Sequence, residues 1–70
     1  MKIQYFADTD TLLIAFNEQP VMETRDLDEN TLLELDADGR VISITLEHAS
    51  ERGDVDSVTY QHLQAAPSKV

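Results

Sequence analysis

The residues best suited to chemistry begin with two aspartates, Asp8 and Asp10, one residue apart. Such a carboxylate pair could share general acid–base work or hold a hard cation. Aspartate at this spacing also stabilises turns, because its side chain hydrogen-bonds to the backbone just ahead of it. We interpret the pair as turn chemistry. The alternative is a small divalent-metal- or ligand-binding enzyme or accessory protein that uses Asp8, Asp10 and His48.

A second acidic stretch, residues 34–39 (Glu-Leu-Asp-Ala-Asp-Gly), resembles the start of a calcium loop, with acids at alternate positions before a glycine. The twelfth position of such a loop needs a bidentate glutamate, and here it is Thr45. A calcium loop would also break the hairpin expected at these residues. We therefore interpret these acids as turn residues.

The histidines, His48 and His62, have no partner at the spacing of metal ligands, so we predict that both lie on the surface. His48 with Ser50 and Asp54 supplies the residue types of a catalytic triad, but no loop suited to an oxyanion hole accompanies them.

The two glycines, Gly39 and Gly53, stand alone, so the sequence contains no glycine-rich phosphate loop. We predict no catalytic residue, no metal or other cofactor, and no enzymatic activity.

The elements that must position these residues are predicted by alternation of apolar and polar side chains, which is typical of β-strands. Residues 2–6 and 11–17 are expected to form a first hairpin. One register gathers their large side chains on one face: it sets Tyr5 opposite Ile14 and Ile3 opposite Phe16.

The second hairpin is marked by Asp38-Gly39 between two apolar-alternating runs, a signature of a two-residue type I′ turn. A turn closed there predicts three pairs: Ala37 with Arg40, Leu35 with Ile42, and Leu33 with Ile44.

The remaining segments are more polar. Residues 21–27 are expected to form an edge strand, whose charges discourage stray pairing. One helical turn is expected at 47–52. Asp54 is a plausible N-cap for a short helix over 55–64, which would turn Val55, Val58 and Leu63 to one side.

The predicted fold is therefore α+β and mainly antiparallel β, with four to five strands in a meander-like sheet and a short C-terminal helix. Residues 1–66 are expected to form a single β-rich domain, and residues 67–70 a frayed C-terminal tail. One short helix can cover at most one face of such a sheet. The second face is then a possible interface, carrying Phe6, Leu13, Leu32 and Val41.

The composition limits the partners. The chain has 14 acidic and 5 basic side chains, a net charge of −9. Nucleic acids and anionic membranes would be repelled, whereas a small basic protein is electrostatically favoured. Cysteine is absent, which excludes disulfides and thiolate metal sites. The N-terminus lacks the apolar stretch of a signal peptide, and a cytoplasmic location is expected.

In the order of these features the sequence resembles the domain of unknown function 2283 family, which comprises small prokaryotic proteins. The resemblance runs from Tyr5 to about Ser50. One departure is Phe6, where the family often has aspartate, and the chain from Gly53 onward is not covered. The residues that carry the resemblance are Tyr5, Asp10, Leu12, Ile14, Val21, Thr24, Arg25, Leu33, Leu35, Asp36, Asp38, Gly39, Ile44, Leu46, Glu47, Ala49 and Ser50.

The resemblance implies a compact antiparallel sheet and offers no catalytic residues to carry over. Its loose association with toxin–antitoxin-like gene pairs points towards a protein partner. The sequence thus predicts a non-enzymatic interaction module, antitoxin-like or self-associating, that forms a homodimer or binds a small basic protein.

Overall fold

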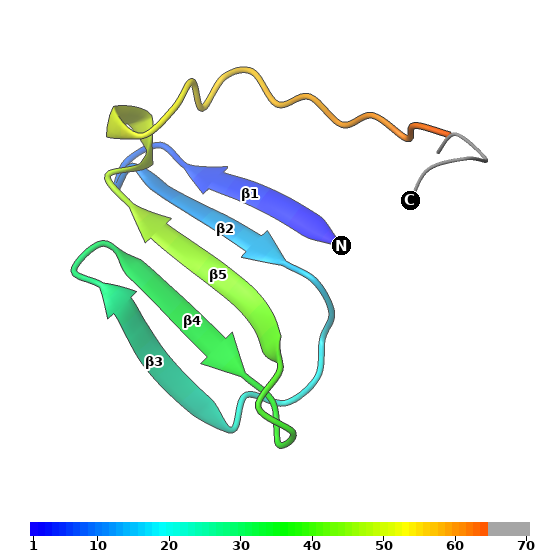
Figure 1. The fold of residues 1–70 in the computed structure, drawn as a ribbon. Coiled ribbons are helices and arrows are strands. Elements are labelled where there is room, and N and C mark those ends of the chain that lie inside the picture. The colour runs from blue at the N-terminus through cyan, green and yellow to red at the C-terminus, as the bar shows by residue number, and fades with distance from the viewer. Residues whose placement is uncertain (65–70) are drawn as a thin grey trace.

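The computed structural model describes residues 1–64 of the 70-residue chain, so the tail predicted at 67–70 lies outside the described residues. Five strands form one sheet, followed by a single 3-10 turn (Figure 1). The elements are β1 (Lys2–Phe6), β2 (Thr11–Ala15), β3 (Glu23–Asp28), β4 (Thr31–Leu35), β5 (Val41–Glu47) and η1 (Ala49–Glu51).

All neighbouring strands are antiparallel, and their order across the sheet is β1-β2-β5-β4-β3. The predicted antiparallel sheet is confirmed, but it is not a simple meander. The connection after β2 leads to the far edge of the sheet, and β5 then returns to the centre, between β2 and β4 (Figure 1). The segment predicted as an edge strand does form an edge, as β3.

The first hairpin has a different register from the predicted one. Tyr5 lies opposite Leu12 and Ile3 opposite Ile14, a shift of two residues. The four-residue turn between Phe6 and Thr11 sets this register, because these two residues form the closing pair of the ladder. A shift of two leaves every side chain on its predicted face, since strand side chains alternate with period two.

The second hairpin keeps the predicted pairing of Leu33 with Ile44, but its turn differs. Of the turn residues only Gly39 has a positive φ, 81°, whereas a type I′ turn would require a positive φ at Asp38 also. The carboxylate of Asp36 accepts hydrogen bonds from the backbone N–H groups of Asp38 and Arg40, both at 2.9 Å.

A bulge follows this turn and changes the predicted pairs nearest to it. Leu35 lies opposite Val41 rather than Ile42. The longer turn consumes one more residue than a two-residue turn would, and the bulge absorbs it.

The predicted C-terminal helix over 55–64 is wrong. The predicted turn near 47–52 is present as η1, but residues 58–64 have no regular structure. Asp54 does initiate a turn, accepting a hydrogen bond from the backbone N–H of Asp56 at 3.0 Å. The turn does not propagate, because helix nucleation is costly and the β-branched and aromatic residues that follow gain little from a helix.

The result is a sheet with no helix packed against it in the described residues. Within residues 1–64 only three apolar residues are buried, Leu35, Ile42 and Ala49, and no large side chain there is completely removed from solvent. The core of the protein is therefore one layer deep.

Candidate functional site

One face of the sheet, here called the apolar face, carries rows of aliphatic side chains across the strands. Residues opposite one another in a ladder share a face, and the central row follows the pairing of Ile3 with Ile14, Ile14 with Ile44, and Ile44 with Leu33. A second row joins Tyr5, Leu12, Leu46 and Thr31.

The apolar face is incompletely covered. Ile14, Ile44 and Leu33 sit on inner strands yet are only half-buried, and Ile3 on the edge strand is 47% exposed. In an ordinary two-layer domain such central aliphatic residues would be fully buried.

After β5, Arg52 and Asp54 line a small hollow at one end of the apolar face. Among the five strands, only the edge strand β3 places charged side chains on this face. Glu23 and Arg25 pair there with Leu35 and Leu33, and they form an ion pair with each other at 2.8 Å. Asp28, opposite Thr31, is the third. Strands β1, β2, β4 and β5 place no charged side chain on this face.

The opposite face, here called the mixed face, holds three of the four residues predicted as a possible interface. Phe6, Leu13 and Leu32 lie on it, and Phe6 is 44% exposed. Val41 does not join their rows, because the bulge sets it opposite Leu35, a residue of the apolar face.

Two carboxylates interrupt the mixed face on strands β4 and β5. Glu34 lies on β4 opposite Ser43 of β5, and the Ser43 hydroxyl donates a hydrogen bond to its carboxylate at 2.6 Å. Glu47, at the end of β5, lies opposite Thr11. The mixed face is therefore polar where the apolar face is most aliphatic.

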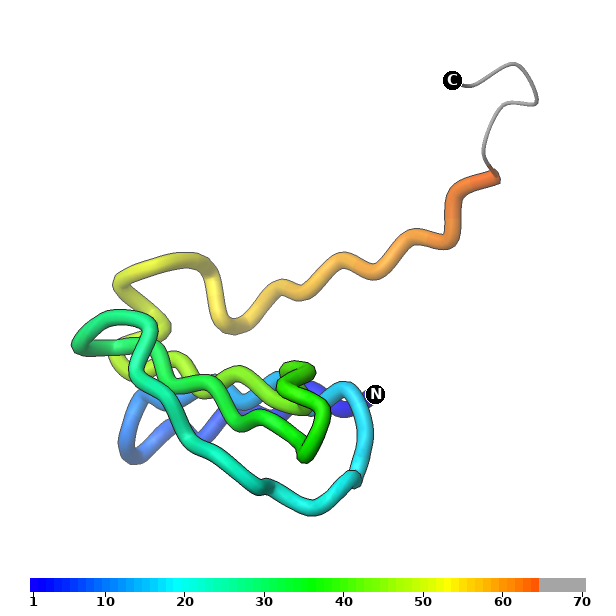
Figure 2. The backbone as a smooth tube through the Cα atoms, turned by 60° about the horizontal axis from the view of Figure 1, so that its bottom comes forward, coloured from blue at the N-terminus to red at the C-terminus, as the bar shows by residue number. Residues whose placement is uncertain are grey.

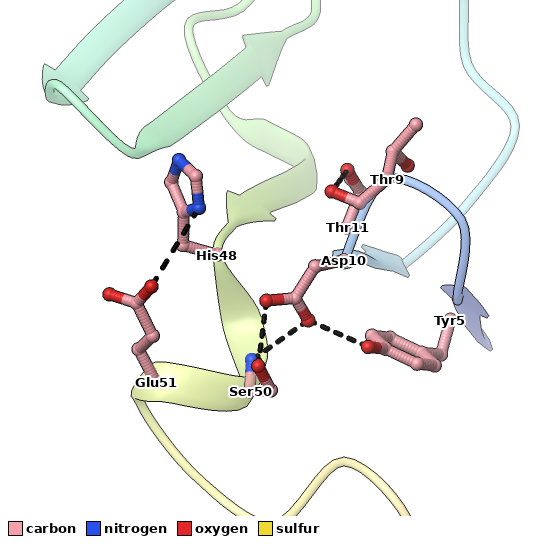
Figure 3. A network of polar contacts seen from close by, with 7 residues as sticks. All are labelled: Tyr5, Thr9, Asp10, Thr11, His48, Ser50 and Glu51. Atoms are coloured by element: carbon pink, nitrogen blue, oxygen red, sulfur yellow. Dashed lines mark hydrogen bonds and ion pairs between the residues drawn. The ribbon is translucent and has the colours of Figure 1, made fainter.

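Asp10 joins the first hairpin to the turn after β5, and we call the three residues Tyr5, Asp10 and Ser50 the aspartate clip (Figure 3). The Tyr5 hydroxyl donates to Oδ1 of Asp10 at 2.6 Å, and the Ser50 backbone N–H donates to the same oxygen at 3.0 Å. The Ser50 hydroxyl donates to Oδ2 at 2.7 Å. A backbone bond from the N–H of Ala49 to the carbonyl of Asp10, 3.0 Å, completes the contact.

The clip changes the acidity of its members. Hydrogen bonds to the ionised carboxylate, first from Tyr5 and then from Ser50, lower the pKa of Asp10. The same bond makes loss of the phenol proton unfavourable, so the pKa of Tyr5 is raised. Asp10 is thus held as a carboxylate that protein donors already satisfy.

The other residues predicted to have possible chemistry do not gather. Asp8 is exposed in the turn beside Asp10. His48 precedes η1 with a φ of 57°, and its Nδ1 lies 3.9 Å from a carboxylate oxygen of Glu51, an exposed contact (Figure 3). His62 is exposed in the C-terminal segment. Within residues 1–64 no three histidine or acidic side chains are grouped to hold a metal ion.

The segment after η1, residues 54–64, is here called the arm. Its start covers one end of the apolar face, where Leu12 and Leu46 line a small open hollow with Ala49, Val55 and Val58. Beyond that point the arm rises away from the sheet (Figure 2). The clip anchors η1, and η1 in turn determines where the arm leaves the sheet.

Sequence reasoning missed both the clip and the extent of the uncovered face. The clip joins residues 40 positions apart, so no local pattern reveals it. A usable signal was present, because Tyr5, Asp10 and Ser50 are all among the residues that carry the family resemblance.

The described part of the chain has no helix with the length and apolarity of a membrane-spanning segment.

The comparisons with known proteins give one match. The model of a family described as "Protein of unknown function (DUF2283)" matches residues 2–50, which include all five strands and the aspartate clip. No curated protein and no solved structure matches the chain. Because the match spans more than half of the 70 residues, the chain belongs to the DUF2283 family of proteins of unknown function.

Proposed function

We propose that this protein is a non-enzymatic protein–protein interaction module, whose sheet is completed by a second polypeptide chain. The observation that carries the proposal is the half-buried apolar face, formed by all five strands, over which residues 1–64 place no helix. A sheet with an apolar face is stable in water when a second layer covers that face. Residues 1–64 supply only the start of the arm for this purpose.

Two classes of partner fit the surface. A second copy of the chain would supply another apolar face. A small basic protein would be attracted by the net charge of −9, because complementary fields accelerate encounter. The carboxylates of the mixed face, together with Phe6, Leu13 and Leu32, would suit the basic partner.

The use of Asp10 supports a role without catalysis. Both of its carboxylate oxygens accept hydrogen bonds from protein donors. A carboxylate has about four acceptor positions, so protein donors occupy most of those of Asp10 before a substrate or ion could approach. In the aspartate clip, the carboxylate of Asp10 holds two loops together.

Native mass spectrometry of the protein purified from cells tests the proposal, because it reports the number and mass of the chains in a complex. We expect one species of defined stoichiometry, containing either two copies or one copy with a second protein. Single-chain ions alone, from protein that circular dichroism shows to be folded at micromolar concentration, would refute the proposal.

A further inference from the structure

We propose that two copies of this chain pack through their apolar faces to form a two-layer β-sandwich. This inference rests on the proposed interaction function and names its partner and its surface. Sheets that pack face to face lie about 10 Å apart with strands within about 30° of each other, so the twist of each sheet is compatible with this arrangement.

The accessible area agrees with a dimer. The chain exposes 5752 Å². A compact monomer of its mass, 7.9 kDa, is expected to expose about 4,400 Å². The difference is about 1,300 Å², whereas a stable dimer of standard size buries about 800 Å² on each partner. The difference includes the exposed arm, so it is an upper limit on the area that the sheet offers, and this limit exceeds what one partner of a dimer needs.

The distribution of charge selects the apolar face over the mixed face. Two mixed faces packed together would bring Glu34 and Glu47 of each copy into the interface, and buried carboxylates are costly. Among the strand residues, Lys2 alone brings a positive charge to that face. Two apolar faces meet through Ile14, Ile44 and Leu33. Charged side chains lie around this centre, at the β3 edge and where Arg52 and Asp54 line one end of the face. A chain of net charge −9 can therefore self-associate through this face without placing its acids at the centre.

Beyond its first residues, the chain's own arm does not cover the apolar face in the structure. Val55 is half-buried, but Val58, Tyr60 and Leu63 are 62%, 81% and 76% exposed. Figure 2 shows the arm leaving the sheet rather than crossing it. The central row of Ile3, Ile14, Ile44 and Leu33 is left for a second copy.

A matched pair of substitutions on strand β1 tests the inference. Ile3 and Phe6 lie on the same edge strand, on opposite faces, and are 47% and 44% exposed. Lysine at either site adds the same charge to the monomer at a similarly exposed position. Light scattering over a range of concentrations should give two chains for the wild type and Phe6→Lys, and one chain for Ile3→Lys.

A second pair of substitutions, Ile3→Thr and Phe6→Thr, tests the inference even if a lysine variant fails to fold. We expect Ile3→Thr to weaken dimerisation about tenfold or more, because each copy loses aliphatic contact area at the interface. Phe6→Thr should change the dissociation constant by less than about threefold, the ordinary scatter of a surface substitution. A chain truncated after Ser57 should remain a dimer.

Three results would overturn the inference. The first is a dimer that Phe6→Lys dissociates and Ile3→Lys does not, which would move the interface to the mixed face and leave the proposed function intact. The second is a dimer lost on truncation after Ser57, which would assign the contact to the arm. The third is a wild-type monomer at every concentration; native mass spectrometry would then decide separately whether another protein is the partner.

Discussion

The Tyr5 hydroxyl donates a hydrogen bond of 2.6 Å to Oδ1 of Asp10, across the turn that joins β1 to β2. The same carboxylate accepts two hydrogen bonds from Ser50, which lies beyond β5. One side chain therefore fixes a turn at each end of the family-matched region. Its removal should loosen η1 and the start of the arm together.

We expect Asp10→Asn to lower the melting temperature by several degrees, because the amide group cannot accept all three hydrogen bonds and presents its own donors to Tyr5 and Ser50. Asp8→Asn is the matched control, an exposed aspartate in the same turn, and should melt close to the wild type. Circular dichroism melting measures both. Equal melting temperatures for the two variants would show that the clip does not contribute to stability.

The dependence of stability on pH in the acidic range should reveal the contribution of the aspartate clip. The pKa of Asp10 is lower in the folded protein than in the unfolded chain, so its stabilisation is complete above the unfolded value, about pH 4, and is lost as the pH falls through the folded value. The melting-temperature difference between wild type and Asp10→Asn should therefore be largest above about pH 5 and shrink below about pH 4. The pKa of Asp28 is also lowered, so the stability of Asp10→Asn should still fall somewhat at acidic pH. A difference that stays constant down to about pH 2 would contradict this account.

Gly39→Ala should destabilise the protein by about 1–2 kcal/mol through backbone strain alone. Gly39 has a φ of 81°, and a Cβ there would meet no atom within 4 Å. Gly53 is the control, because it is equally open but has no positive φ in this range. Urea denaturation should show Gly53→Ala to be neutral or slightly stabilising. Equal effects of the two substitutions would mean that the turn does not hold its left-handed residue in solution.

Saturating magnesium, calcium or zinc should leave the melting temperature unchanged, because a ligand stabilises a protein only by binding its folded form. The carboxylate of Asp10 is engaged by Tyr5 and Ser50, and the ring of His48 lies next to Glu51 instead (Figure 3). Thermal melting with each ion in turn is the measurement, with Asp10→Asn as a control. An upward shift that Asp10→Asn abolishes would favour the metal-binding alternative.

The sequence predicted the strands well because period-two alternation and turn residues are local signals. The pairing of Leu33 with Ile44 follows from the apolar pattern, which tolerates no slip of a single residue. The first hairpin is different, since a slip of two preserves both faces. Its register depends on the conformation of the turn, where Asp10 has a φ of 55°.

The errors arose where contacts between distant parts of the chain determine the structure. The helix over 55–64 was predicted from a capping residue and three apolar positions, yet two of these, Val58 and Leu63, are 62% and 76% exposed in the structure. The position of β5 between β2 and β4 reflects pairing between strands distant in sequence. Without that pairing, the central row of Ile3, Ile14, Ile44 and Leu33 cannot be recognised from the sequence.

Isotope-filtered nuclear Overhauser spectroscopy on a mixed sample of labelled and unlabelled chains tests the central claim most directly, because it detects only contacts between copies. We predict methyl contacts between the Ile14 and Ile44 side chains of one copy and the apolar face of the other. Contacts between copies confined to Leu13 and Leu32, or none from any methyl group of the sheet, would contradict it.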